Sequence, residues 1–207
     1  MPFANYVSIA DVARAYQITL RDEKFVTPLE RPVSEILRQQ LAFAENFAAY
    51  NSSEWAVCEY LIHPLLNEVW KSYTDDLMLW SHVPLTYDAD LSGTPDYLVA
   101  RKSPLGRWLL DQPYLVVVEA KRDDAERGWS QCLAALLAAQ KLNNIPELAL
   151  YGIATNGRSW EFGKLEGSTF TRDFLPFSLR NIEDLCGAVH FVFERCRSQL
   201  SSLSHSA

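Results

Sequence analysis

The chain has 207 residues, a net charge of −7, 48% hydrophobic residues and 22% charged residues. These values are ordinary for a globular domain that buries its own core, so they exclude a disordered chain. No apolar run approaches the ~18 residues of a membrane span, and the N-terminal segment lacks the basic and apolar regions of a signal peptide. We therefore expect a single domain over residues 1–207 with no membrane association.

The charge is distributed unevenly along the chain. Residues 1–95 contain 6 basic and 13 acidic side chains, which accounts for the whole net charge, and the remainder is balanced. An acidic balance argues against a protein that coats nucleic acid non-specifically.

Cysteine and histidine spacing gives no metal-binding motif. No two of the four cysteines are spaced as CxxC, so the sequence predicts neither a zinc knuckle nor a redox motif. The histidines show no ligand spacing either. These residues are Cys58, Cys132, Cys186 and Cys196, and His63, His82, His190 and His205. We expect the protein to lie in the cytoplasm, which is a reducing compartment.

The first 50 residues are predicted to form an N-terminal helical extension. Ser8 and Asp11 have the spacing of a capping box at the start of a helix. Residues 18–32 contain two prolines and read as loop with a short strand. Ser34 caps an amphipathic helix that runs to residue 50. Its apolar stripe is expected to contain Ile36, Leu37, Gln40, Leu41, Ala44 and Phe47.

Another helix is predicted over residues 53–73, with Ser53 as its cap. Pro64 interrupts this helix, because proline lacks the amide hydrogen that an inner helical turn requires. It either kinks the helix or begins a second one directly behind it.

The middle of the chain changes to the alternating pattern of β-strands. Strands are predicted over residues 77–83, 95–100, 115–121, 148–155 and 159–165. Residues 115–121 are apolar on both faces, which favours a central strand. Residues 87–94 read as a turn-rich connector, and residues 156–158 as a tight turn between antiparallel strands.

Two further helices complete the pattern. One is predicted over residues 123–144. The closing helix is predicted from the pattern of residues 181–200, and we place its bounds at 181–203. Residues 201–207 form a C-terminal end that should fray. The order of helices, three strands, helix, strands and helix predicts an α/β fold with a mixed central sheet flanked by helices.

Charged residues stand where the two central strands begin and end. Asp96 opens one apolar strand, and Glu119 and Lys121 end the next. Residues two apart on a strand share a face, so Glu119 and Lys121 point the same way. The short connection between the strands favours antiparallel pairing, which would bring Asp96 close to Glu119.

This combination of groups suits phosphodiester hydrolysis. Carboxylate oxygens from Asp96 and Glu119 are the ligands that Mg²⁺ or Mn²⁺ takes, and such a cation neutralises charge that develops on a phosphate. An ammonium group at Lys121 can orient the attacking water.

The residues Pro95-Asp96, the following apolar strand and Glu119-Ala120-Lys121 resemble the signature of the PD-(D/E)XK nuclease superfamily. The resemblance implies a restriction-endonuclease-like αβββαβ core in which Asp96, Glu119 and the Ala120 carbonyl bind the metal. Segments around Glu54 and residues 154–162 are also similar to the nuclease segment of type I restriction motor subunits and of small stand-alone bacterial relatives.

The same resemblance implies a helix carboxylate and a helix glutamine at the site. Glu54 and Glu59 both qualify as the carboxylate; we favour Glu54, as a catalytic and metal-binding residue, because it lies at the helix end that can reach the strand ends. Gln131 qualifies as the glutamine. Relatives often carry a tyrosine four residues later, where this chain has Ala135.

Surface contacts to DNA are expected from basic residues near the site. The first candidates are Arg101, Lys102, Arg122 and Arg127, with a secondary contact from Arg158. Trp55, Trp129 and Trp160 are candidates for stacking on bases, although packing in the core is the commoner use of tryptophan.

The sequence thus predicts a Mg²⁺-dependent endonuclease acting on DNA. The alternative is a non-catalytic nuclease-fold protein that binds nucleic acid or a protein partner, and a third hypothesis is a metal-dependent hydrolase of another phosphate ester. A homodimer would suit cleavage of both strands of a duplex.

Overall fold

The computed structural model describes residues 2–121 and 125–204 of the chain. Its helices are η1 (Pro2–Asn5), α1 (Ile9–Tyr16), α2 (Glu35–Phe47), α3 (Glu54–Val57), η2 (Cys58–Ile62), α4 (His63–Trp70), η3 (Lys71–Tyr73), α5 (Ala125–Asn143) and α6 (Ile182–Ser204). Its strands are β1 (Thr19–Asp22), β2 (Leu77–Ser81), β3 (Leu85–Thr86), β4 (Ser92–Gly93), β5 (Tyr97–Lys102), β6 (Leu110–Ala120), β7 (Leu150–Thr155), β8 (Ser159–Glu166), β9 (Thr169–Arg172) and β10 (Phe177–Ser178).

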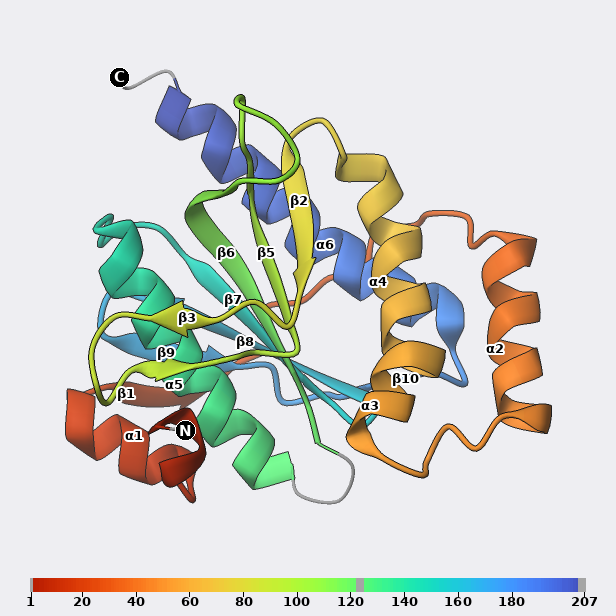
Figure 1. The fold of residues 1–207 in the computed structure, drawn as a ribbon, viewed down its shortest axis with the longest axis horizontal. Coiled ribbons are helices and arrows are strands. Elements are labelled where there is room, and N and C mark those ends of the chain that lie inside the picture. Colours follow the sequence, from red (N-terminus) through yellow and green to blue (C-terminus); the bar gives the residue numbers. More distant parts are fainter. Residues whose placement is uncertain (1, 122–124, 205–207) are drawn as a thin grey trace.

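A mixed sheet forms the centre of the molecule (Figure 1). Within the described residues it has eight strands, in the order β1-β9-β8-β7-β6-β5-β2 with β10 beside β8. The neighbours β2–β5, β5–β6 and β7–β8 pair antiparallel, whereas β6 and β7 are parallel. Parallel strands need a crossover, and α5 supplies it. The predicted mixed sheet flanked by helices is confirmed, as is the antiparallel pairing of the two central strands.

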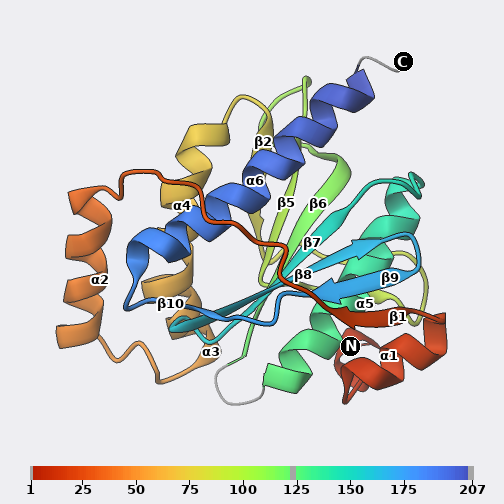
Figure 2. The ribbon, with the colours of Figure 1, turned by 180° about the vertical axis from the view of Figure 1, so that it is seen from behind.

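Helices cover both faces of the sheet. Helix α5 packs on β6 and β7 and carries α1 on its outer side, whereas α4 packs on α6 and β2. Figure 2 shows α6 crossing the opposite face of the sheet from α5. One continuous cluster of buried apolar side chains runs through both layers, from Phe3 to Cys196.

The N-terminal 50 residues contain a strand as well as helices. The capping box of Ser8 and Asp11 is present at the start of α1. Ser34 caps α2 through the amide of Leu37. Between these helices, β1 pairs in parallel with β9 and extends the sheet at its edge. This segment is therefore part of the sheet layer and not a purely helical extension.

Helix α2 buries a narrower face than its sequence pattern predicts. Leu37, Leu41 and Ala44 are buried as expected. Gln40 is exposed, and Ile36 and Phe47 are 62% and 79% exposed. The predicted stripe was too wide because α2 contacts little beyond α4 and η2. The helix also ends at Phe47 rather than at residue 50.

Pro64 lies where the helix after Ser53 changes its winding. Ser53 caps α3 as predicted, and the chain then passes through a π-helical turn, η2, before α4 begins at His63. The second predicted outcome, a new helix that begins directly behind the first, is therefore confirmed. The wider turn accommodates a residue that has no amide hydrogen to donate, and π-turns of this kind occur frequently at functional sites.

Three short pairings were not predicted. Residues 87–94 are not merely a connector, because β4 pairs with β3 in a small hairpin. Strands β9 and β10 add to the sheet beside β8.

At the C-terminus, α6 continues to Ser204, so residues 201–204 are helical rather than frayed, and residues 205–207 lie outside the described residues.

No helix in residues 2–121 and 125–204 combines the length and the apolar character needed to cross a membrane.

Candidate active site

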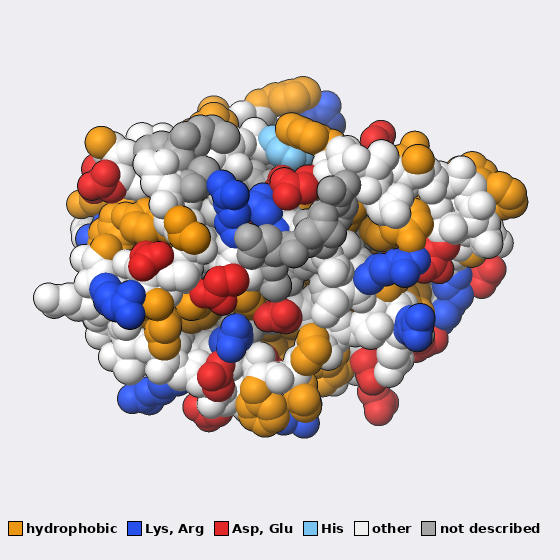
Figure 3. All heavy atoms as spheres, turned by 90° about the horizontal axis from the view of Figure 1, so that it is seen from below, with side chains coloured by type: hydrophobic (Ala, Val, Ile, Leu, Met, Phe, Trp, Pro, Cys, Tyr) orange, Lys and Arg blue, Asp and Glu red, His pale blue; other side chains and the backbone are white. Residues whose placement is uncertain are grey.

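The five side chains predicted to form a site all line one cavity of about 430 Å³. They are Glu54, Asp96, Glu119, Lys121 and Gln131. The cavity lies at the end of the sheet where β6 finishes and α3 begins. Figure 3 shows this end of the molecule, where acidic and basic side chains gather next to a histidine. Cavities of about 540 and 970 Å³ lie elsewhere and contain none of these five side chains.

Asp96 is held at the junction of β5 and β6. Its Oδ2 atom accepts a hydrogen bond from the amide of Ala120 at 2.7 Å, and its Oδ1 lies 3.4 Å from Nε2 of His82. Burial raises the pKa of the Asp96 carboxyl and the nearby Glu54 carboxylate adds to this, while the Ala120 amide and the charges of Lys121 and His82 act in the opposite direction.

Glu119 is the most enclosed charged group of the cavity. Its side chain is 4% exposed, and no hydrogen bond or ion pair from the described residues reaches its carboxylate. Burial raises the pKa of Glu119 well above its ordinary value, and the neighbouring carboxylates of Asp96 and Glu54 raise it further. Only Lys121 lowers it. A buried carboxylate with this little compensation is unusual, because its desolvation is costly.

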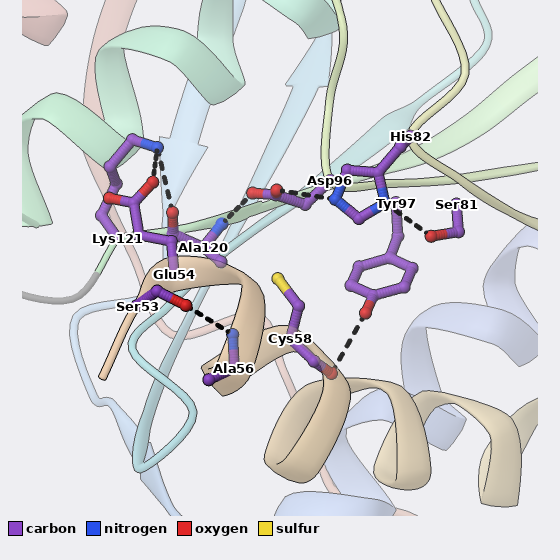
Figure 4. Close-up of polar contacts among 10 residues, drawn as sticks. All are labelled: Ser53, Glu54, Ala56, Cys58, Ser81, His82, Asp96, Tyr97, Ala120 and Lys121. Atoms are coloured by element: carbon purple, nitrogen blue, oxygen red, sulfur yellow. Dashed lines mark hydrogen bonds and ion pairs between the residues drawn. The ribbon is translucent and has the colours of Figure 1, made fainter. Parts of the chain in front are cut away.

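Lys121 connects the strand end to helix α3 (Figure 4). Its Nζ atom donates to Oε2 of Glu54 at 3.1 Å and to the carbonyl of Ala120 at 3.0 Å. Gly128 of α5 lies over the side chain, since an added Cβ there would be 3.2 Å from Cγ of Lys121. The lysine is 16% exposed, whereas Glu54 is 48% exposed.

The structure separates the two candidate helix carboxylates. Glu54, in the first turn of α3, lines the cavity and pairs with Lys121. Glu59 lies in the π-turn, is exposed and does not line the cavity. Gln131 of α5 also lines the cavity.

The oxygen atoms present suit a hard divalent cation. Asp96, Glu119 and Glu54 offer carboxylates, and the Ala120 carbonyl lies beside them. The uncompensated Glu119 carboxylate supports this fit, because a cation would supply the opposite charge that the described residues provide only through Lys121. Cysteine or histidine ligands would not be needed.

The predicted DNA contacts on β5 do not lie at this cavity. Arg101 and Lys102 occupy the opposite end of β5 from Asp96, about 16–20 Å away for an extended chain. There Arg101 pairs with Asp111 at 3.0 Å, and Lys102 donates to the carbonyl of Thr74 at 2.8 Å. The expectation that this pair lies near the site was wrong, because residues a few positions apart in sequence are far apart along an extended strand.

The other basic candidates have different surroundings. Arg127 is exposed in the first turns of α5. Arg158 donates to the hydroxyl of Tyr50 and lies 3.6 Å from Glu45, so its charge is directed at the α2 segment. Arg122 lies outside the described residues.

Only one of the three candidate tryptophans is available for stacking. Trp129 and Trp160 are 1% and 0% exposed, and their ring nitrogens donate to Glu161 and to the carbonyl of Gly157. These two belong to the core. Trp55 is 66% exposed at the mouth of the cavity, where its ring stacks on His82 with centroids 4.1 Å apart.

Sequence reasoning missed His82 and Cys58. His82 directly follows β2, whose Ser81 lies opposite Tyr97 of β5, so His82 lies beside Asp96. Cys58 lies at the start of the π-turn, and its carbonyl accepts a hydrogen bond from Tyr97. The spacing of the histidines along the sequence gave no sign of this, because the pairing of β2 with β5 creates a proximity that spacing along the chain does not show.

No protein-family model matches the sequence, and no curated protein is significantly similar to it. Functional inference therefore rests on the fold and on the chemistry of this cavity.

Proposed function

We propose that the protein is a metal-dependent nuclease that hydrolyses DNA phosphodiester bonds, built on a restriction-endonuclease-like core. The order α4, β2, β5, β6, α5, β7 supports the second part of this proposal. The Pro95-Asp96 and Glu119-Ala120-Lys121 segments, which resemble the PD-(D/E)XK signature, stand at adjacent ends of β5 and β6.

The single observation that carries the proposal is the buried, uncompensated carboxylate of Glu119 facing Asp96 and Lys121 in one cavity. A purely structural strand end would expose such a group to solvent or pair it with a base. Here the carboxyl is kept buried at a cost to stability, which is typical of sites that bind a cation or carry out catalysis.

Asp96, Glu119, Glu54 and the Ala120 carbonyl are the groups that would hold Mg²⁺ or Mn²⁺. When bound, the cation supplies a Lewis acid that neutralises charge developing on the phosphate. The Ala120 amide fixes the orientation of Asp96, and Glu54 holds the ammonium of Lys121 at the edge of the cavity.

Hydrolysis forms a bond between a water oxygen and phosphorus and breaks a phosphorus–oxygen ester bond. The water gives up a proton to solvent, and the leaving oxygen gains one from solvent. Lys121 donates hydrogen bonds to the attacking water or to a phosphate oxygen, which orients the water and stabilises the added negative charge. Gln131 lies within the same cavity and can donate to the substrate.

A cleavage assay tests this proposal directly. The wild type is incubated with single-stranded, duplex and branched DNA in Mg²⁺, in Mn²⁺ and in chelator. We expect metal-dependent cleavage of at least one substrate, and its loss in Asp96→Asn. Asp111→Asn, which changes a carboxylate at the far end of β6, is the matched control and should cleave normally.

DNA binding without cleavage in either metal would contradict the proposal. It would favour the alternative of a nuclease-fold protein that binds nucleic acid without cutting it. Cleavage of small phosphate esters but of no DNA would favour a hydrolase of another phosphate ester.

A further inference from the structure

Asp96 faces two sets of ligands with different chemistry. On one side lie the oxygen donors already described. On the other lie the thiol of Cys58 and the imidazole of His82. One ligand atom from each of Cys58, His82 and Asp96 lies within 4.8 Å of the other two. Figure 4 shows the three residues converging from β5, from the end of β2 and from the π-turn.

His82 is held in one orientation by contacts on several sides. Its backbone has φ of 52°, in the left-handed region, and its amide donates to the carbonyl of Asp96 at 3.0 Å. The ring stacks on Trp55, and Nδ1 lies 2.7 Å from the hydroxyl of Ser81. When the hydroxyl accepts from Nδ1–H, the lone pair of the ring is on Nε2, the atom that faces Asp96.

The Nε2 atom of His82 is buried and makes no hydrogen bond within residues 2–121 and 125–204. Its nearest charged neighbour, Oδ1 of Asp96 at 3.4 Å, is within the range of an ion pair but lacks hydrogen-bond geometry. A buried polar atom of this kind calls for an explanation, and an ion is one of the explanations.

Cys58 is presented to the same point by the π-turn. Its carbonyl is fixed both by the amide of His63 and by the hydroxyl of Tyr97 at 3.1 Å. The thiol itself is buried and free of any disulfide. Its position is thus set by the helix and by β5 together, and not by a flexible loop.

We propose that Cys58, His82 and Asp96 form a binding site for a transition-metal ion of the Zn²⁺ class. Sulfur and imidazole ligands select zinc and related ions and disfavour Mg²⁺, which takes oxygen ligands. Three protein ligands leave a fourth position open, as in zinc sites that bind a water or a substrate. The contact from Ser81 to Nδ1 is the supporting interaction that metal-binding histidines usually have.

In a tetrahedral zinc site neighbouring ligand atoms are about 3.3–3.8 Å apart, as follows from zinc–ligand bonds of about 2.0–2.3 Å. The three atoms here are within 4.8 Å of one another, so each pair lies at most about 1–1.5 Å beyond that spacing. The simpler explanation is an ion pair between His82 and Asp96 beside a thiol that only packs in the core. The two explanations predict different responses of the protein to an added transition-metal ion.

Cobalt binding distinguishes them and does not require nuclease activity. The purified full chain is titrated with Co²⁺, and absorption from thiolate-to-cobalt charge transfer is recorded in the near ultraviolet together with the visible bands of tetrahedral cobalt. We expect one equivalent of Co²⁺ to produce both. Zn²⁺ should then abolish them, whereas Mg²⁺ at millimolar concentration should not.

Variants assign the ligands. Cys58→Ser should lose the charge-transfer band, whereas Cys186→Ser, which changes a buried thiol on α6, should keep it. His82→Gln retains the thiol and should weaken Co²⁺ binding at least tenfold. Ser81→Ala should weaken it about tenfold, because the supporting contact to Nδ1 is lost. If Cys58→Ser does not fold by circular dichroism, His82→Gln decides the question.

Absence of the charge-transfer band in the wild type would overturn the proposal. So would a band that survives in Cys58→Ser, an affinity unchanged in His82→Gln, or displacement of Co²⁺ by Mg²⁺ as readily as by Zn²⁺. The cleavage assay tests the oxygen ligands separately, because the cobalt bands report only on the thiol and imidazole ligands.

Discussion

The two ends of the β5–β6 hairpin carry similar charged residues in very different environments. At the far end, Arg101 pairs with Asp111, both partly exposed, and Lys102 donates to a backbone carbonyl. At the cavity end, Glu119 is buried without a partner among the described residues, and Asp96 and Glu54 add negative charge to the same space. The far end is electrostatically satisfied by the fold itself, whereas at the cavity end the Glu119 carboxylate has no such partner among the described residues.

The lysines at these two ends should differ most in activity. Lys121→Ala removes the ammonium group from the cavity and should lower DNA cleavage by about 10²-fold or more, the usual effect of losing a group that stabilises developing charge. Lys102→Ala should cleave like the wild type, because its Nζ donates to the carbonyl of Thr74, far from the cavity. Single-turnover cleavage rates measure both.

Binding of DNA should be nearly unchanged in Lys121→Ala, as measured by fluorescence anisotropy in Ca²⁺. Equal cleavage rates in the two variants would contradict the role given to Lys121 and would remove the contrast between the two ends.

Metal ions should stabilise the protein only through the cavity end. A ligand that binds the native state alone, at a hundredfold excess over its Kd, stabilises it by about 2.7 kcal/mol. For a chain of this size that corresponds to a rise in Tm of about 5–10 °C. We expect Mg²⁺ or Mn²⁺ to produce a rise of this order in the wild type and in Asp111→Asn.

Asp96→Asn should lose most of this response. Its stability without metal should equal or slightly exceed that of the wild type, because one of several converging negative charges is removed. Differential scanning calorimetry with and without metal gives both numbers. If the Tm of the wild type does not respond to metal, the interpretation of the cavity end as a metal-binding site is contradicted.

The buried Glu119 should make stability depend on pH. Its pKa in the folded protein is raised well above the ordinary value of 4.5. Below that value the folded and unfolded chains both hold the proton. As pH rises, the unfolded chain releases its proton first, so the free energy of unfolding falls until the folded carboxyl has ionised as well.

Glu119→Gln removes this titration at nearly constant shape. In metal-free buffer the variant should match the wild type at about pH 4 and exceed it at neutral pH, since only the wild type loses stability as its unfolded chain ionises first. Urea unfolding across this range is the measurement. A constant difference between the two proteins at every pH would show that packing, and not charge, separates them.

Local patterns predicted the parts of the site that depend on short-range rules. The serine caps at positions 8, 34 and 53 could be predicted from the sequence because a cap involves only the next few residues. The approach of Asp96 to Glu119 followed from strand alternation and a short connection. The same rules failed for Arg101 and Lys102, because proximity in sequence was taken for proximity in space along an extended strand.

His82 and Cys58 could not be found in this way. Their nearness to Asp96 depends on the register of β2 against β5 and on a π-turn near Pro64, and neither is determined by residues close in sequence. The exposure of Ile36 and Phe47 was missed for a related reason, since helical periodicity does not say how much of a helix face the rest of the fold covers.

The turns at the two ends of β8 extend the comparison to backbone packing. Gly157 forms the turn at the cavity end with φ of 83°, and an added Cβ there would lie 2.8 Å from Val57 and 2.9 Å from Leu61. Gly167, at the other end, has φ of 55° and nothing within 4 Å of such an atom. Both glycines adopt a backbone conformation that alanine disfavours, but only Gly157 also packs tightly against the α3–η2 helix.

Gly167→Ala should therefore cost about 1 kcal/mol through backbone strain alone. Gly157→Ala should cost about 1–2 kcal/mol more, because the added methyl group must displace Val57 and Leu61. Since α3 also carries Glu54, Gly157→Ala should lower the rate of DNA cleavage at a temperature where both variants are folded, whereas Gly167→Ala should not. Urea unfolding and cleavage rates test the two parts separately. Equal losses of stability would show that the turn does not support the helix, and an unchanged cleavage rate in Gly157→Ala would show that the position of Glu54 is set elsewhere.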